Sequence, residues 1–341
     1  MKDQIRPEHL EDQQRSAYLE DVARYSSVAH EFVDRACPGC GLWTDPGDEA
    51  WLVHLGFCFS RCKSCWTIFM NPGPTEKLIE WFYQGSENYR FWAEHMYPAS
   101  QEQRRRLLHD PRAQWVTETL SRIGSSAQHE VQGFLANSQP GALEVMEVGA
   151  GTGQTLQALR RALPDARLVG LEPNPAMWPL WSDPSIELIP DFMKDDESHG
   201  QFDIILAFEV LEHLLAPGAF FRRVGEKLRP GGLLLVSTPN AASLEVQLLA
   251  DSSTTIDVEH ISLLTPAALH ALAAKHGMVV LEIDTPGQMD CDLIKACSLH
   301  SPLASALQLI CESDETGDEF QVLLSAFGFS SHLRAVIGLP A

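Results

Sequence analysis

The chain has few basic residues for its length. Lysine and arginine together number 25 against 46 aspartates and glutamates, so the formal net charge is −21 over 341 residues. The acids are spread along the chain, and such a surface repels a phosphate backbone, which disfavours nucleic acid as a partner. The one dense basic run is Arg104–Arg106, with Arg112 nearby. It has two interpretations, the solvated face of a helix and a phosphate-binding site.

Long apolar runs and a leader pattern are also missing. No stretch reaches the roughly 18 apolar residues that a membrane span needs. The first residues, MKDQIRPEHLEDQQ, are too polar for a secretory signal peptide. We therefore expect a cytoplasmic protein with no membrane partner. In a reducing compartment the 8 cysteines indicate metal binding or catalysis rather than disulfides.

Four of the cysteines form two C-x2-C pairs. Cys37 and Cys40 make the first pair, and Cys62 and Cys65 make the second, with 21 residues between them. Two such pairs can place four thiolates tetrahedrally around one Zn²⁺, whereas the alternatives are a redox motif and chance pairing. The intervening WLVHLGFCF predicts a short β-hairpin, and Cys58 within it is not expected to be a ligand. Because a closed four-thiolate site has no open position for chemistry, we expect a structural zinc.

The composition divides the chain into four segments. We predict a helical lead-in over 1–35, a zinc-binding module over 36–72, a helical linker or lid over 73–138, and an α/β domain over 139–341. In the α/β domain strands and helices alternate, which is typical of a parallel sheet with crossover helices. The predicted strands are 143–148, 166–171, 186–189, 202–207, 233–237, 278–284 and, as a possible last strand, 333–339. The predicted helices are 153–163, 209–228 and 265–276, with a helical insertion over about 286–331.

The sharpest motif is EVGAGTG at 147–153, between a predicted strand and a predicted helix. Glycines there allow a tight turn and let a ligand approach the N–H groups at a helix N-terminus. The third glycine comes one residue too early for a dinucleotide fingerprint, and no GK[ST] follows as in a Walker loop. Glu147 is awkward beside a pyrophosphate but suits a ligand that carries an ammonium and a sulfonium. Glu172, 23 residues after Gly149, can accept both hydroxyls of a ribose.

Together with FDIILAFEVLEHLLAPGAFFRRVGEKLRPGGLLLVSTPN, these motifs make residues 140–285 resemble class I S-adenosylmethionine (SAM)-dependent methyltransferases. The resemblance implies a Rossmann-like α/β fold with a doubly wound, seven-stranded, mostly parallel sheet. It also implies the residues that bind SAM: Glu147, Gly149, Gly151 and Gly153 for the methionyl group, Glu172 for the ribose, Asp191 and Phe192 for the adenine, and Phe208 and Glu209 to close over the cofactor.

Two acid–histidine motifs are candidates for catalysis. Glu209, Glu212 and His213 are spaced i, i+3 and i+4, which predicts that they share one helical face. The motif with a later histidine, His260, resembles the metal site of small-RNA 2′-O-methyltransferases and ubiquinone-pathway O-methyltransferases. That resemblance implies that these four side chains bind a divalent ion, Mg²⁺ or Mn²⁺, which lowers the pKa of the acceptor hydroxyl. An acid–histidine pair also occurs here in methyltransferases that need no metal, so both possibilities stay open.

A four-cysteine module ahead of a SAM domain, with Glu259-His260 after the fifth strand, also resembles deoxysugar C-methyltransferases and related enzymes of surface-polysaccharide and antibiotic-sugar pathways. The resemblance implies a small-molecule acceptor, a sugar or sugar nucleotide, methylated at carbon or oxygen. It implies that His260, supported by Glu259, is the general base. The aromatic segment 81–97 would cover the acceptor or pack as a helical core. The alternative from another functional class is a non-catalytic methyltransferase-like interaction protein.

Overall fold

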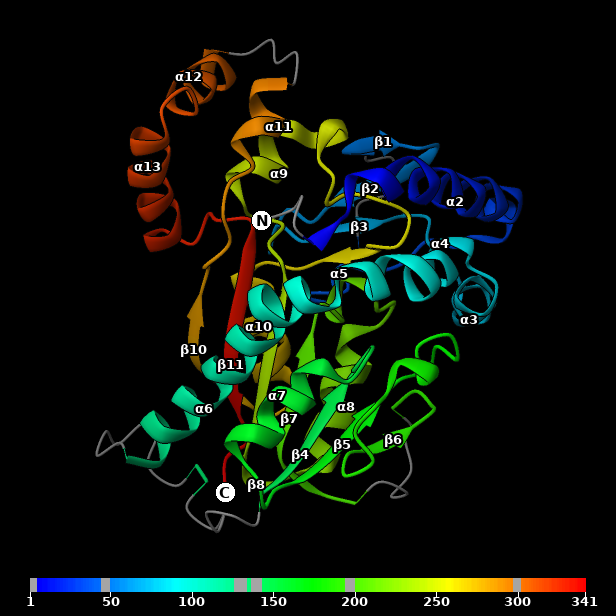
Figure 1. Cartoon of the computed structure of the whole chain (residues 1–341). Helices are drawn as coiled ribbons and strands as arrows, with labels where there is room; N and C mark the ends of the chain where they lie inside the picture. Colours follow the sequence, from blue (N-terminus) through cyan, green and yellow to red (C-terminus); the bar gives the residue numbers. More distant parts are fainter. Residues whose placement is uncertain (1–4, 44–49, 126–133, 136–142, 194–199, 297–301) are drawn as a thin grey trace.

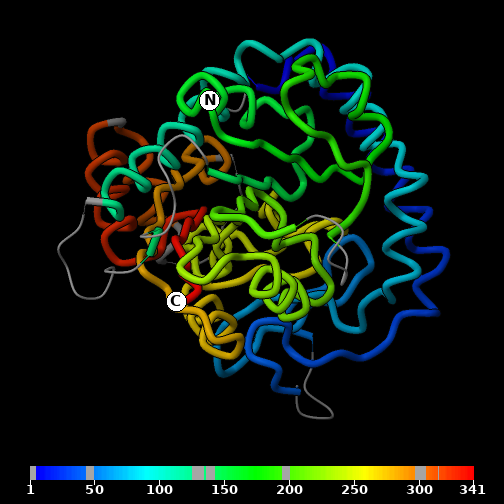
Figure 2. The backbone as a smooth tube through the Cα atoms, turned by 90° about the horizontal axis from the view of Figure 1, so that it is seen from below, coloured from blue at the N-terminus to red at the C-terminus, as the bar shows by residue number. Residues whose placement is uncertain are grey.

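The computed structural model describes residues 5–43, 50–125, 134–135, 143–193, 200–296 and 302–341. Within these ranges the chain forms a larger and a smaller β-sheet, both enclosed by helices (Figure 1). The N-terminal helices run along one side of the molecule, and the last three helices lie on the opposite side (Figure 2).

The larger sheet has seven strands in the order β10-β11-β8-β7-β4-β5-β6. Its members are β4 (Glu144–Val148), β5 (Arg167–Leu171), β6 (Glu187–Ile189), β7 (Phe202–Phe208), β8 (Leu228–Pro239), β10 (Val279–Asp284) and β11 (His332–Gly338). Strands β4 to β8 pair in parallel, and β11 is antiparallel to both neighbours. The predicted doubly wound, mostly parallel sheet is confirmed, including its possible last strand.

Helices cover both faces of this sheet. The helices concerned are α6 (Asp110–Ser125), α7 (Gln154–Ala162), α8 (Pro217–Lys227) and α10 (Pro266–Lys275). Side chains of α6 and α7 pack with Val145 and Ile204 on one face, and side chains of α8 and α10 pack with Met146 and Ile205 on the other. Because successive strand residues point to opposite faces, β4 and β7 are apolar throughout most of their length and buried on both sides.

The smaller sheet has the order β1-β2-β3-β9. The predicted hairpin between the cysteine pairs is present as β1 (Leu52–His54) and β2 (Phe57–Arg61), followed by β3 (Ile68–Met70). The fourth strand, β9 (Ser262–Leu263), comes from the second half of the chain and pairs antiparallel with β3. The segment with the cysteines therefore shares a sheet with residues that closely follow His260.

The remaining described chain is mostly helical. The N-terminal helix α2 (Glu8–Ser27) is followed by η1 (Ala29–Glu31), α3 (Glu76–Gln84), α4 (Glu87–Phe91) and α5 (Tyr97–Arg104). Two π-helical segments, η2 (Trp92–Met96) and η3 (Arg105–His109), join α4, α5 and α6 into one bent helix. The other elements are η4 (Trp178–Leu180), α9 (Leu244–Leu249), η6 (Ala250–Ser252), α11 (Cys291–Ala296), α12 (Pro302–Ile310) and α13 (Asp314–Ala326). None of the helices described combines the length and the apolar character needed to cross a bilayer.

The predicted helix over 209–228 is wrong in its first half. Helix α8 begins only at Pro217, and the segment before it holds a 3-10 turn, η5 (Leu211–His213). Glu209 has a φ of +57°, which a right-handed helix cannot contain. Proline is favoured at the first helical position, so Pro217 marks the true start. Glu209, Glu212 and His213 therefore do not share a helical face.

Candidate active site

The turn after β4 is built on left-handed glycines. The φ angles are +67° at Gly149, +54° at Gly151 and +73° at Gly153, and α7 begins directly afterwards. Only glycine adopts these angles without strain. A Cβ added to Gly149 would lie 2.8 Å from Val210 Cγ2, so the turn after β7 packs closely against the turn after β4.

Glu147, near the end of β4 and just before this turn, has a buried carboxylate. The residue is 3% exposed, and its Oε2 has no hydrogen-bond partner among the described residues. Burial raises its pKa to about 8, although Arg112 and a hydrogen bond from Thr155 act in the opposite direction. A buried carboxylate oxygen without a donor is costly. An ammonium group placed beside the glycine turn would supply the missing donor.

Glu172 stands at the end of β5 and joins two backbone segments. Its Oε2 accepts a hydrogen bond from the Gly151 N–H at 2.7 Å, and its Oε1 accepts one from the Asn174 N–H, also at 2.7 Å. Burial raises its pKa above the ordinary value. Trp181 also contacts the glycine turn, because its Nε1 donates to the Gly151 carbonyl at 2.8 Å.

The other residues predicted at the cofactor also lie at this edge of the sheet. Asp191 and Phe192 closely follow β6, where the Ile189 carbonyl accepts from the Glu172 N–H at 3.0 Å. Phe192 is 47% exposed. Phe208 ends β7 and is buried beneath the Arg112 guanidinium, which lies 5.3 Å from its ring centre.

Glu209 is separated from the other predicted metal ligands. Its carboxylate accepts from the Ser237 hydroxyl at 2.6 Å and pairs with His332 Nε2 at 3.1 Å. Arg112 Nη2 lies 3.5 Å away. Burial alone would raise the pKa of Glu209, but His332 and Arg112 outweigh it and hold that pKa well below its usual range. The sequence gives no signal for His332, which is brought here by the last strand.

Glu212, His213 and His260 come together, with ligand-capable atoms all within 4.8 Å of one another. Glu212 is 1% exposed and accepts from the Thr238 hydroxyl at 2.9 Å. Burial and Glu209 raise its pKa to about 7. His213 Nδ1 lies 3.1 Å from the Glu259 carbonyl, and burial together with His260 lowers its pKa to about 3.

His260 is held by Asp257 and Thr255. Its Nδ1 donates to the Thr255 carbonyl at 2.8 Å and lies 3.4 Å from Asp257 Oδ2, which leaves Nε2 as the nitrogen that can exchange a proton. Burial alone would lower its pKa, but Asp257, Glu212 and the Thr255 carbonyl raise it to about 9.

The Glu259 carboxylate points elsewhere. It accepts a hydrogen bond from Asn88 Nδ2 at 2.7 Å, so its support of His260 is through its charge rather than a hydrogen bond. Tyr83, from the predicted aromatic segment, has its ring centre 6.5 Å from that of His213 and packs on Tyr89 at 5.1 Å between ring centres. The sequence gives no signal for the contact between Asn88 and Glu259, because 171 residues separate them.

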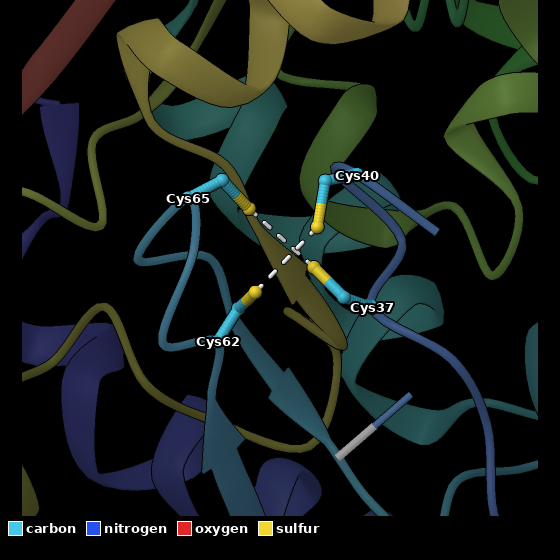
Figure 3. Close-up of side chains that lie close together, drawn as sticks. All are labelled: Cys37, Cys40, Cys62 and Cys65. Atoms are coloured by element: carbon cyan, nitrogen blue, oxygen red, sulfur yellow. Dashed lines mark hydrogen bonds between the residues drawn. The ribbon is translucent and has the colours of Figure 1, made fainter. Parts of the chain in front are cut away.

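The four predicted cysteines converge on one point (Figure 3). Sγ of Cys37 lies 3.5 Å from Sγ of Cys65, and the Cys40 and Cys62 sulfurs are also 3.5 Å apart. Cys58, as expected, is not a member of this cluster. Arg35 is half-buried and interacts electrostatically with Cys37, and its buried Nη1 has no hydrogen-bond partner among the described residues.

Comparison with known proteins gives one broad match. A methyltransferase domain family model matches residues 92–283, more than half of the chain. The chain is similar to ubiquinone biosynthesis O-methyltransferases. The protein of that name from Bradyrhizobium diazoefficiens is 36% identical over 107 residues, which cover 29% of this chain and 41% of that protein. The protein from Azorhizobium caulinodans is 31% identical over 105 residues, with the same coverage of 29% and 41%. The match thus spans about two fifths of these relatives.

Among solved structures, one similar chain comes from the complex of the Haloferax volcanii Trm112 methyltransferase activator with its putative methyltransferase. The TM-score is 0.48 at 16% identity, with 74% of this chain and 98% of that chain covered.

Proposed function

The chain belongs to the methyltransferase domain family of SAM-dependent enzymes, and on that premise we propose that it methylates a small-molecule acceptor held at His260. The observation that carries the proposal is the contact between the glycine turn after β4 (Gly149–Gly153, called the donor turn below because it would bind the methyl donor) and the turn after β7, which contains Val210. Gly149 of the donor turn packs on Val210, and Glu212 and His213 follow in the same segment. An acceptor beside His260 is therefore next to the donor site.

The donor side fits SAM in charge and shape. Glu147, with its unpartnered Oε2, would accept from the ammonium of the methionyl group, while the glycine turn leaves room for it. Glu172, already fixed by two N–H groups, keeps lone pairs for the ribose hydroxyls. Asp191 and Phe192 would flank the adenine, and Phe208 would close over the cofactor. Bound SAM supplies an electrophilic methyl group on a sulfonium.

On the acceptor side, the neutral form of His260, which is the minor form at pH 7 because the pKa is about 9, would take the proton from the attacking atom. Since Nδ1 is held by the Thr255 carbonyl, Nε2 receives this proton, and Asp257 stabilises the resulting imidazolium. Placing the nucleophile and the methyl carbon within about 3–3.5 Å of each other supplies much of the rate enhancement. Tyr83 and Tyr89 offer an aromatic wall for a sugar or ring.

A second candidate is a metal-dependent O-methyltransferase, favoured by the convergence of Glu212, His213 and His260. One carboxylate and two imidazoles form a ligand set that leaves coordination positions open for an acceptor hydroxyl. Glu209 is not one of the three, because its carboxylate is engaged by Ser237 and His332.

For the four cysteines we propose a structural Zn²⁺. Four sulfurs within 4.8 Å of one another match a tetrahedral thiolate site. A zinc with four thiolates would carry a net charge of −2, and the guanidinium of Arg35, which interacts electrostatically with Cys37 and has an unpartnered Nη1, would offset part of that charge.

The test of the proposed function is an acceptor screen. Purified protein is incubated with labelled SAM and a panel of sugars, sugar nucleotides and catechols, and methylated products are identified by mass spectrometry. We expect one class to become labelled. Loss of labelling in EDTA, with recovery in Mg²⁺ or Mn²⁺, supports the metal-dependent candidate, and activity unaffected by EDTA supports His260 acting alone. No labelled product from any class contradicts both and supports a non-catalytic role.

A further inference from the structure

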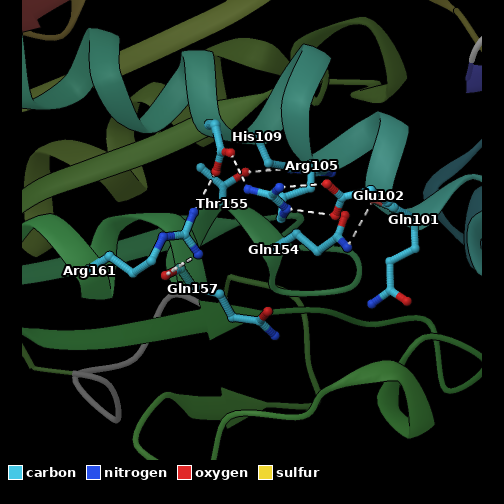
Figure 4. A network of polar contacts seen from close by, with 9 residues as sticks. Gln101, Glu102, Arg105, His109, Gln154, Thr155, Gln157 and Arg161 are labelled. Carbon is cyan, nitrogen blue, oxygen red and sulfur yellow. Dashed lines mark hydrogen bonds and ion pairs between the residues drawn. The ribbon is translucent and has the colours of Figure 1, made fainter.

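The three consecutive arginines of the basic run have different environments. Arg105 pairs with Glu102 (Figure 4). It also pairs with Asp110, and Arg106 is exposed. Arg104 instead lies against two aromatic rings. Its guanidinium carbon is 4.7 Å from the centre of the Tyr97 ring and 5.4 Å from that of Trp92.

The guanidinium of Arg6, near the N-terminus, packs on the same Trp92 ring. The guanidinium carbon of Arg6 lies 5.4 Å from the centre of the Trp92 ring. Burial lowers the pKa of Arg104, and the charges of Arg112 and Arg6 lower it further, while Tyr97 opposes them. Arg104 therefore lies close to two other positive charges, in a chain of formal net charge −21.

Within the described ranges no carboxylate forms an ion pair with Arg6 or Arg104, whereas Arg112 lies 3.5 Å from Glu209. The Nε of Arg104 is buried and has no hydrogen-bond partner in the same ranges. A buried donor on a charged group is expensive to leave without an acceptor.

The helical segment that carries Arg104 contacts the start of α7, which directly follows the glycine turn. Gln154 Nε2, at the start of α7, donates to the Gln101 carbonyl at 3.5 Å, about one turn before Arg104. His109 Nδ1 lies 2.9 Å from the Thr155 hydroxyl, about one turn after it (Figure 4).

We propose that Arg6 and Arg104, with the rings of Trp92 and Tyr97, form a binding site for a phosphate group carried by the methyl acceptor. Guanidinium groups present forked donors that match phosphate oxygens, and Arg104 Nε is such a donor without an acceptor. The aromatic rings add surface on which a base or sugar attached to the phosphate can stack. The role as an acceptor site rests on the proposed function, but the existence of the anion site does not.

The experiment uses inorganic pyrophosphate as the probe and the full chain saturated with S-adenosylhomocysteine (SAH), so that the donor site is already filled. Calorimetry at low salt should show one pyrophosphate bound per chain. Arg104→Gln should weaken that binding at least tenfold, and Arg6→Gln should weaken it several-fold. Arg105→Gln, on the same helix but already neutralised by Glu102 and Asp110, is the matched control and should change it less than twofold.

Pyrophosphate that fails to bind the SAH-saturated protein, or an equal loss in Arg105→Gln and Arg104→Gln, would overturn the site. SAH affinity is measured for every variant. Arg104→Gln should leave it unchanged, and if that variant does not fold, Arg6→Gln carries the comparison. If the protein binds pyrophosphate but not SAH, the anion site stands and the proposed SAM site is wrong. Failure of the anion site can therefore be distinguished from failure of the proposed function.

Discussion

The Thr265 hydroxyl donates a hydrogen bond to the Cys65 carbonyl at 2.6 Å. The same hydroxyl accepts from the Ala268 N–H at 3.1 Å and so caps α10. Just before it, β9 pairs with β3, and the Ile261 carbonyl accepts from the Met70 N–H at 3.1 Å. The cysteine site is thereby joined through backbone contacts to the segment that carries His260.

Removal of the proposed zinc should therefore loosen residues 261–265 before it affects the donor site. We expect faster amide hydrogen exchange in that segment after chelation, with SAH affinity changed less than threefold, because Glu147 and Glu172 lie on the other sheet. Hydrogen-exchange mass spectrometry and calorimetry measure the two effects, and added Zn²⁺ should reverse the first. Unchanged exchange in the metal-free protein would show that the cysteines do not support this segment.

Replacing His260 by Gln should separate catalysis from donor binding. Turnover should fall by roughly 10²–10⁴, the usual contribution of a general base, while SAH affinity stays within twofold. His270→Gln is the matched control, since His270 is exposed on α10. Initial rates and calorimetry report the two quantities. Turnover that survives His260→Gln would remove His260 from the mechanism.

Gly149→Ala tests the contact between the two turns. The left-handed φ of +67° costs an alanine about 1–2 kcal/mol, and the added Cβ would meet Val210 Cγ2 at 2.8 Å. We expect lower thermal stability and weaker SAH binding. Gly151→Ala is the comparison, because its φ is also positive but no atom lies within 4 Å of an added Cβ. Equal stability of the two variants would indicate that Val210 does not pack on the turn.

Glu147 gives the donor site a pH dependence with a definite sign. Its folded pKa of about 8 lies above the ordinary 4.5, so its contribution to stability is complete below pH 4.5 and is lost as the pH rises through about 8. The ionised carboxylate is the form that accepts from an ammonium. SAH binding should therefore tighten between about pH 6 and 8, by at most about tenfold per unit for one released proton. Glu147→Gln should make this profile flat, and a wild-type profile as flat as that of the variant would rule out Glu147 as the ammonium acceptor.

The fold and the donor turn were predictable because their signals are local. The glycines at 149, 151 and 153 and the acids at 147 and 172 lie at or just after the ends of buried strands. The start of α8 is not predicted correctly, although Pro217 is a visible signal, because Glu209, Glu212 and His213 happen to have helical spacing.

The supporting contacts of the site had no such local signal. Asn88 reaches Glu259, and His332 reaches Glu209, from segments 171 and 123 residues away in the chain. Only the folded topology brings them together. The environment of Arg104 is only partly predictable from the sequence. The basic run is visible there, but the packing of the Arg104 guanidinium against Tyr97 and Trp92 is not.

The most direct test of the account is calorimetric titration of SAH into the wild-type protein and into Glu172→Ala. That change removes the carboxylate that fixes Gly151 and Asn174 and that is proposed to hold the ribose. The account predicts one SAH bound per wild-type chain and at least tenfold weaker binding by the variant. Absence of SAH binding by the wild-type protein, or equal affinity in the two proteins, would contradict it.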